Sequence, residues 1–341
     1  MIGVGVIGYG YWGPNLVRNF AEVPGSRVVA VSDLRVERLA QVQARYPVVK
    51  TTTHYRDLIT DPAIDAIVIA TPVSTHFDLA LQALQAGKHV LVEKPLAETS
   101  EQATRLIEEA SRRSRVLMVD HTFVYTSAVR KIWELVASDG LGDIYYYDSV
   151  RVNLGLFQRD VNVIWDLAVH DLSIMDYVLP LQPCAVSATA MSHVPGGPED
   201  VAYLTFFFDS NLIAHVHVNW LAPVKVRRTL IGASRKMIVY DDLEPSEKVK
   251  IYDKGITVNN GESMYQMLIG YRTGDMWAPQ LDVTEALRTE LLHFIRCIGE
   301  GEPPIVDGEA GLRVVRILEA ATQSMAKRGW LVELDRGRIA A

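Results

Sequence analysis

The chain has 341 residues and a mass of 38.0 kDa, a length that fits two domains better than one. Hydrophobic residues make up 49% and charged residues 22% of it, which excludes a disordered or low-complexity protein. The net charge of −7 argues against a general nucleic-acid binder or a protein of anionic membrane surfaces.

The cysteines and the start of the chain bear on the cellular compartment. Cys184 and Cys297 lie far apart and in no motif, so they predict neither a disulfide framework nor a zinc site. No apolar run approaches the roughly 20 residues of a membrane-spanning helix, and no export signal precedes the first strand. We therefore expect a cytoplasmic protein without nucleic-acid or membrane partners.

The first third of the chain alternates strands and helices. Strands are predicted over 2–7, 27–32, 66–70, 89–92 and 116–119. Helices are predicted to start at Pro14 and to cover 75–86 and 99–112. Near-continuous apolar strands separated by helices indicate a parallel sheet that is covered on both faces.

The alternation of strands and helices ends near residue 121. Helices are predicted over 126–137, 165–177, 284–298 and 308–327. Successive strands, expected to pair antiparallel, are predicted over 144–152, 185–192, 201–208, 212–220, 224–231 and 236–240. Residues 253–282, with four glycines, are predicted to be irregular. We expect two domains, 1–121 and 122–341, with a late helix able to pack back on the first.

A glycine-rich turn follows the first strand. Gly8, Gly10 and Gly13 have the Gly-x-Gly-x-x-Gly spacing, and Asp33 stands 20 residues beyond Gly13 at the end of the next strand. This context predicts a dinucleotide site, with the pyrophosphate on the helix N-terminus and Asp33 on the adenosine ribose. The negative charge favours NAD, while Arg35 keeps NADP as the alternative.

Two further segments carry groups suited to proton transfer. Lys94 lies at the carboxyl end of a predicted strand, the edge where open α/β sheets bind ligands. Asp166 and His170 are four residues apart and share a helix face, where the acid can orient the imidazole. An ordinary surface pair explains that spacing equally well.

Several stretches resemble the Gfo/Idh/MocA oxidoreductases, named for glucose–fructose oxidoreductase, inositol dehydrogenase and a rhizopine-catabolism protein. The matching stretches are Gly8 to Gly13 with Asp33, Ala70-Thr71-Pro72 with His76, Ala86 to Pro95, and Asp166-x-x-x-His170. The resemblance implies an α/β fold with an N-terminal Rossmann domain. It also implies a C-terminal α+β domain whose large, open, mostly antiparallel sheet often forms the interface of a dimer or tetramer.

The resemblance implies a catalytic set of Lys94, Asp166 and His170. Either His170 or Lys94 is the base, and the sequence leaves this open. The expected cofactor-binding residues are Gly8, Gly10, Tyr11, Trp12, Gly13, Asp33, Arg35, Thr71, Pro72, His76, Glu93, Lys94 and His121. The expected substrate-binding residues are Tyr125, Arg151, Asn153, Asn162, Trp165, Lys225 and Arg227.

Within the family, the chain is similar to a nucleotide-sugar branch. The similar stretches are Gly8 to Asn15, Trp165 to Ile174 and Gly274 to Pro279. This implies NAD-dependent oxidation of a secondary hydroxyl, at C3, of a nucleotide-linked sugar such as a UDP-amino sugar or UDP-uronic acid. The alternatives are an inositol or polyol dehydrogenase, a ketoreductase, a redox-neutral glycosidase and a non-catalytic ligand sensor. His215 and His217 share a strand face, but no third ligand lies nearby, so we expect no metal.

Overall fold

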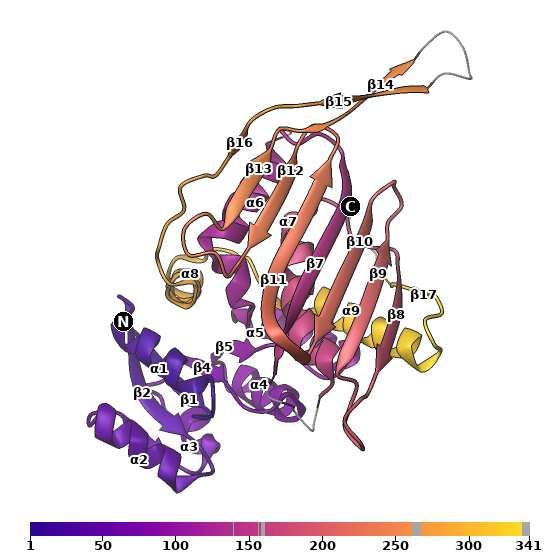
Figure 1. Ribbon diagram of the computed structural model, residues 1–341. Helices are drawn as coiled ribbons and strands as arrows, with labels where there is room; N and C mark the ends of the chain where they lie inside the picture. The colour runs from indigo at the N-terminus through magenta and orange to yellow at the C-terminus, as the bar shows by residue number, and fades with distance from the viewer. Residues whose placement is uncertain (139, 156, 158–160, 261–266, 336–341) are drawn as a thin grey trace. The chain divides into compact units, whose positions relative to one another are not determined.

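The computed structural model describes residues 1–138, 140–155, 157, 161–260 and 267–335. The chain divides into two compact units (Figure 1). The first combines Met1–Thr126 with Thr284–Arg316, and the second combines Ser127–Val283 with Ile317–Ala341. Among the described helices, none is long and apolar enough to cross a membrane.

The first unit is built on a six-stranded parallel sheet of order β3-β2-β1-β4-β5-β6. Its strands are β1 (Ile2–Ile7), β2 (Ser26–Ser32), β3 (Lys50–Thr52), β4 (Ala66–Ile69), β5 (His89–Glu93) and β6 (Leu117–Asp120). Its helical elements are α1 (Gly13–Glu22), α2 (Val36–Arg45), α3 (Tyr55–Thr60), η1 (Val73–Thr75), α4 (His76–Gln85), α5 (Ser100–Arg113), η2 (Thr122–Tyr125) and α8 (Ala286–Glu300). The central strands are fully buried, as expected for a parallel sheet with helices on both faces.

The second unit is built on a nine-stranded sheet of order β16-β13-β12-β11-β7-β10-β9-β8-β17. Its strands are β7 (Ile144–Leu154), β8 (Ala185–Met191), β9 (Val201–Phe207), β10 (Ile213–Asn219), β11 (Leu221–Ala233), β12 (Met237–Asp241), β13 (Val249–Tyr252), β16 (Met276–Trp277) and β17 (Val332–Glu333). Its helices are α6 (Ser127–Ala137), a π turn over Ile164–Ala168, α7 (Val169–Val178) and the second half of α9 (Gly308–Ala326).

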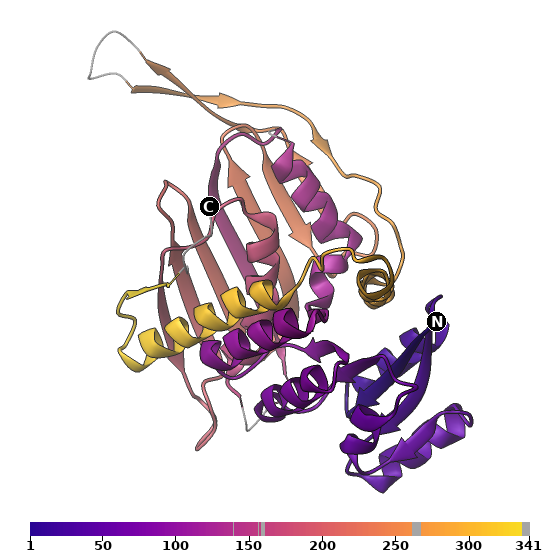
Figure 2. The same cartoon turned by 180° about the vertical axis from the view of Figure 1, so that it is seen from behind.

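The helices of the second unit lie on one face of its sheet. Figure 2 shows α6, α7 and the second half of α9 along that face, and Ser324 of α9 accepts a hydrogen bond from the backbone of Ala188 in β8. The opposite face is turned to the viewer in Figure 1, where no helix of the described part of this unit covers it. The predicted fold class, a Rossmann-type domain followed by a domain with a large, mostly antiparallel sheet, is confirmed.

The sheet is mixed, as the prediction of a mostly antiparallel sheet allows, since β7 and β10 at its centre pair parallel. Two details of the prediction are wrong. The segment 165–177 is not one regular helix, since it begins as a π turn. Part of the stretch 253–282 is regular: β14 (Gly255–Asn260) and β15 (Met267–Arg272) form a two-stranded antiparallel sheet, while residues 261–266 lie outside the described residues.

Two buried carboxyl groups of the first unit, Asp120 and Glu290, lie next to each other. Asp120 also connects the glycine turn to β6. Asp120 ends β6 and accepts hydrogen bonds from the Trp12 indole at 2.6 Å and from the Thr122 hydroxyl. Glu290 of α8 is 0% exposed, and burial together with the charge of Asp120 raises its pKa well above the ordinary value. Burial raises the pKa of Asp120 as well.

This pair makes the stability of the first unit depend on pH. In the unfolded chain a glutamate ionises at about pH 4.3. In the folded chain Glu290 keeps its proton to higher pH. Above that pH the unfolded state binds fewer protons, so the free energy of unfolding falls as the pH rises toward the folded pKa.

We therefore predict that Glu290→Gln raises the melting temperature at pH 8 and leaves it nearly unchanged at pH 4. A gain of roughly 2–4 °C would correspond to about 1 kcal/mol in a unit of this size. Glu300→Gln, an exposed change at the end of the same helix, is the matched control. A difference in melting temperature that stays constant from pH 4 to pH 8 would contradict the prediction.

Candidate active site

The glycine turn joins β1 to α1 by an unusually close backbone approach. Gly8 has a φ of +98°, and a Cβ there would lie 2.4 Å from the carbonyl oxygen of Ala70. A Cβ on Gly13 would lie 2.3 Å from the carbonyl oxygen of Gly8. Both positions therefore exclude every residue except glycine. At Gly10 the space is open, since the nearest atom to a Cβ is Arg35 Nη2 at 3.6 Å.

Asp33 follows β2 and is fixed by three sets of donors. Its carboxylate accepts hydrogen bonds from the backbone N–H of Tyr9 at 2.7 Å and of Arg35 at 2.9 Å, and from the Arg35 guanidinium at 3.1 Å. Burial alone would raise the pKa of Asp33, but these bonds hold it below the ordinary value. Asp33 is thus an oriented anion, and the half-exposed Arg35 side chain lies beside both it and Gly10.

The ends of β4 and β5 are tied together by a buried histidine. His76 is 1% exposed, and its ring nitrogens lie 2.8 Å from the carbonyl oxygens of Pro95 and Thr71. This contact fixes the segment that carries Lys94, at the carboxyl end of β5. The structure therefore places His76 in the core, where its ring joins the Thr71-Pro72 and Glu93-Lys94-Pro95 segments.

His121 follows β6 with its imidazole 1% exposed. Burial, and then the positive charge of Lys94, lower the pKa of His121 to about 3, so Lys94 and a neutral His121 are neighbours at this edge. Neither ring nitrogen has a hydrogen-bond partner within the described part of the chain. On the glycine turn, Tyr11 is 84% exposed, while Trp12 is held by Asp120.

These features fit a dinucleotide. The open space at Gly10 at the N-terminal end of α1 suits a pyrophosphate, and Asp33 is placed for ribose hydroxyls. A buried imidazole without a partner is costly, so His121 is suited to a polar group of a bound cofactor. Glu93 pairs in register with Asp120, which puts Lys94 and His121 at the same edge of the sheet.

Asp166 lies in the π turn of the second unit and His170 directly after it. The N–H of Val169 bonds to the carbonyl of Ile164, five residues back, which defines the turn. Such single π turns inside helices occur frequently at functional sites. Asp166 Oδ2 accepts a hydrogen bond from the Trp220 indole at 3.1 Å.

Two predicted sugar contacts lie at this turn, Asn162 just before it and Trp165 within it. The Trp165 indole donates to the Thr322 hydroxyl at 3.1 Å, and Asn162 donates to a carboxylate oxygen of Glu199 at 3.1 Å. Both side chains remain partly exposed. Asn153, near the end of β7, is also partly exposed.

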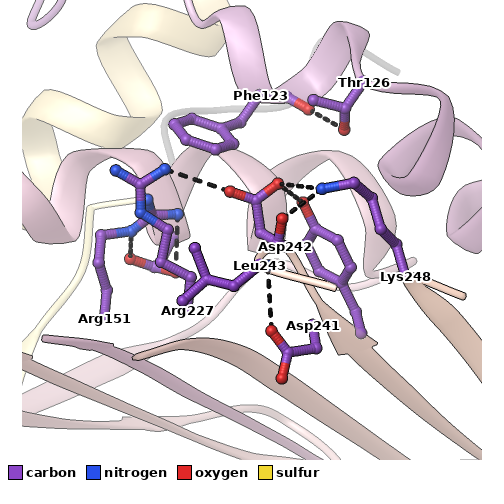
Figure 3. A network of polar contacts seen from close by, with 10 residues as sticks. Phe123, Thr126, Arg151, Arg227, Asp241, Asp242, Leu243 and Lys248 are labelled. Atoms are coloured by element: carbon purple, nitrogen blue, oxygen red, sulfur yellow. Dashed lines mark hydrogen bonds and ion pairs between the residues drawn. The ribbon is translucent and has the colours of Figure 1, made fainter. Parts of the chain in front are cut away.

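The predicted basic substrate residues differ in their surroundings. Arg151 forms a buried ion pair with Asp171 of α7 at 2.6 Å, which accounts for Arg151 without a substrate. In Figure 3, Arg227 and Lys248 lie on either side of Asp242, and Arg227 Nη1 is 3.2 Å from its carboxylate. Lys225 is exposed where the pairing of β11 with β7 shifts register.

Tyr125 belongs to the first unit. Its side chain is 2% exposed, and its hydroxyl lies 2.8 Å from Nδ1 of His293 in α8. The structure thus places this predicted substrate contact in a hydrogen bond of the core.

A cavity of about 460 Å³ in the first unit lies away from these residues. His89 and Leu117, the first residues of β5 and β6, line it, so it opens at the amino ends of the strands. Ligands of open α/β sheets bind at the carboxyl ends, where Gly8 and Lys94 lie.

The sequence analysis missed Trp220 and Glu290. Trp220 follows a strand in no recognisable motif, and Glu290 reads as an ordinary polar position of a helix. The local sequence does not predict the contact of Trp220 with Asp166, because the two residues are 54 positions apart. It does not predict the contact of Glu290 with Asp120 either, since these residues are also far apart in the chain.

Two models of one protein family match the chain. The N-terminal model of an oxidoreductase family, with an NAD-binding Rossmann fold, matches residues 2–121. The C-terminal alpha/beta domain of the same family matches residues 134–334.

Full-length relatives include sugar and inositol dehydrogenases. UDP-N-acetylglucosamine 3-dehydrogenase of Acidithiobacillus ferrooxidans is 29% identical, over 91% of this chain and 93% of that protein. A solved structure of that enzyme has a TM-score of 0.79 over 96% of this chain and 97% of its own. Two inositol dehydrogenases of Bacillus subtilis are each 26% identical. The alignment with scyllo-inositol 2-dehydrogenase (NAD(+)) spans 98% of this chain and 95% of that enzyme. The alignment with scyllo-inositol 2-dehydrogenase (NADP(+)) spans 96% of this chain and 94% of that enzyme.

The two family models together cover most of the chain, and the glycine turn with its oriented acid belongs to the matched N-terminal domain. The predicted enzyme class, an oxidoreductase acting on CH–OH groups, is confirmed by these matches. The chain belongs to the Gfo/Idh/MocA oxidoreductase family.

Proposed function

We propose that the chain oxidises a secondary hydroxyl, at C3, of a nucleotide-linked sugar such as a UDP-amino sugar or UDP-uronic acid. The observation that carries this is the full-length similarity to UDP-N-acetylglucosamine 3-dehydrogenase, at 29% identity. The partly exposed Asp166 and His170 beside Trp165 and Asn162 support it, since they combine a proton-transfer pair with polar groups suited to a sugar.

The residues divide the chemistry as follows. NAD, when bound, supplies the acceptor for the hydride that leaves the carbinol carbon. His170 takes the hydroxyl proton as general base, a role for which imidazole is the commonest side chain. Asp166 orients the imidazole, and the Lys94 ammonium stabilises the negative charge that develops on the oxygen.

An inositol or polyol dehydrogenase is the second candidate. It is favoured by the inositol dehydrogenase of Bacillus subtilis, which is 26% identical and covers 98% of this chain. A nucleotide-sugar enzyme should require the UDP group for its kcat/KM, because distant parts of a substrate contribute binding energy to the transition state. Comparing UDP-N-acetylglucosamine with N-acetylglucosamine and myo-inositol separates the two candidates.

The catalytic set gives a prediction for turnover. Lys94→Ala and His170→Ala should each lower kcat by about a hundredfold or more, because each removes charge or proton transfer at the reacting oxygen. The Kd for NAD should stay nearly constant, since the glycine turn and Asp33 hold the cofactor. Turnover with UDP-N-acetylglucosamine and NAD titration check this. Full activity of both variants would contradict it, and loss of NAD binding would reassign the residues to the cofactor.

We infer NAD rather than NADP as the preferred cofactor. A 2′-phosphate would meet the Asp33 carboxylate, whose pKa is lowered and which is therefore ionised at neutral pH. Asp33→Ala should weaken NAD binding by roughly tenfold and reduce the preference, since hydrogen bonds to a charged group are lost. Arg35→Ala, the matched variant that keeps the acid, should sharpen the preference for NAD. Calorimetry showing tighter binding of NADPH to the unchanged protein would overturn the inference.

We propose that the open face of the nine-stranded sheet binds a second copy of the chain. Phe207, Ile213 and Tyr146 stand opposite one another on neighbouring strands and are 39%, 45% and 36% exposed. An apolar row of this kind is typical of an interface.

Light scattering at micromolar concentration should therefore give a mass of at least two chains. Ile213→Asp should lower that mass, because it places a charge within the row. Val283→Asp, at a position 98% exposed outside the sheet, is the control and should not. A monomer for the unchanged protein would rule out the proposed interface.

A further inference from the structure

Trp220 is the largest fully buried side chain among the described residues. It also contacts the π turn. It lies between β10 and β11 and is 0% exposed. Its indole N–H donates to Asp166 Oδ2 at 3.1 Å. An indole has one donor and no acceptor, so this bond uses its whole polar capacity.

The tryptophan itself is held on two sides. Its backbone N–H donates to the carbonyl of Asp200 at 2.9 Å, and its own carbonyl accepts from the N–H of Gly155 at 3.0 Å. A Cβ on Gly155 would lie 2.5 Å from Cδ1 of the indole. The indole therefore packs directly against the backbone of residue 155, which restricts its motion toward that side.

The segment that holds Trp220 also holds the start of the π turn. Glu199 accepts a hydrogen bond from the Val163 N–H at 3.0 Å through its carbonyl, and its carboxylate accepts one from Asn162. The next residue, Asp200, is 0% exposed and accepts bonds from the His193 ring at 2.7 Å and from two backbone N–H groups. Residues 199 and 200 thus connect the tryptophan and the turn through one fixed segment.

We propose that Trp220 is a positioning residue that acts through Asp166. By holding one carboxylate oxygen, the indole fixes the rotation of the carboxylate, and so fixes the acid that orients His170. This inference rests on the proposed function, in which Asp166 and His170 act together in proton transfer. It predicts that the indole N–H affects kcat and leaves cofactor binding unchanged.

A double-mutant cycle tests the proposal. The variants are Trp220→Phe, Asp166→Ala and the two combined, assayed with NAD and the best substrate among UDP-N-acetylglucosamine, UDP-glucuronic acid and myo-inositol. Trp220→Phe should lower kcat by about tenfold to a hundredfold, the range for a lost hydrogen bond to a charged group, with the Kd for NAD unchanged. The combined variant should turn over like Asp166→Ala alone, because residues that act as one unit are not additive.

Two further variants separate positioning from stability. Gly155→Ala pushes the indole without removing any polar group, so it should lower kcat in the same direction as Trp220→Phe. It also serves as the test if Trp220→Phe does not fold. Trp133→Phe, at a position 44% exposed on α6, is the matched control for loss of an indole and should leave kcat unchanged.

The contact can also be followed without turnover. The indole N–H resonance that disappears in Trp220→Phe should shift in Asp166→Ala, because its acceptor is gone. No shift would overturn the proposal.

The outcomes of the cycle distinguish two kinds of failure. If the effects of Trp220→Phe and Asp166→Ala multiply in the combined variant, the positioning role is wrong and the proposed function stands. If Asp166→Ala is fully active, the proposed catalytic set fails, and the inference fails with it.

Discussion

The close approach of backbones at Gly8 and Gly13 is the constraint on which the first unit depends. A Cβ at either position would lie within 2.5 Å of a carbonyl oxygen. Glycine at position 8 lets the turn between β1 and α1 pack against the end of β4, and glycine at position 13 lets the start of α1 pack against residue 8. The parallel strands that follow end at the same edge. As a result, an oriented Asp33, the Lys94 segment and the buried His121 share one border of the sheet.

In the second unit, an irregular helical turn is held against a sheet. A single π turn is a local departure from regular α-helical hydrogen bonding, and here groups remote in sequence contact it on both sides. Glu199 fixes its start and Trp220 contacts its acid. Deeper in the same unit, the buried pair of Arg151 and Asp171 joins α7 to the sheet, and removing one partner would leave an uncompensated charge. This charged pair therefore serves the architecture of the unit.

The sequence predicted those features that depend on local pattern. The strands of the parallel sheet, the glycine turn and the acid after the second strand follow from apolar runs and from spacing. The π turn was not predictable, since its residues have an ordinary helical pattern and the extra residue is accommodated by tertiary contacts. The parallel pairing of β7 with β10 depends on the order of strands in the sheet, which adjacent turns do not reveal. Trp220 and Glu290 were missed because each contacts an acid remote in sequence.

We propose that this chain removes a hydride from C3 of a nucleotide-linked sugar. Mass spectrometry of the reduced cofactor formed from UDP-N-acetylglucosamine deuterated at C3 tests this proposal. We expect the deuterium to appear in NADH, with a matching loss from the sugar. NADH without deuterium would place the oxidation at another carbon. No reduction of NAD with this substrate, while myo-inositol is oxidised, would contradict the nucleotide-sugar assignment.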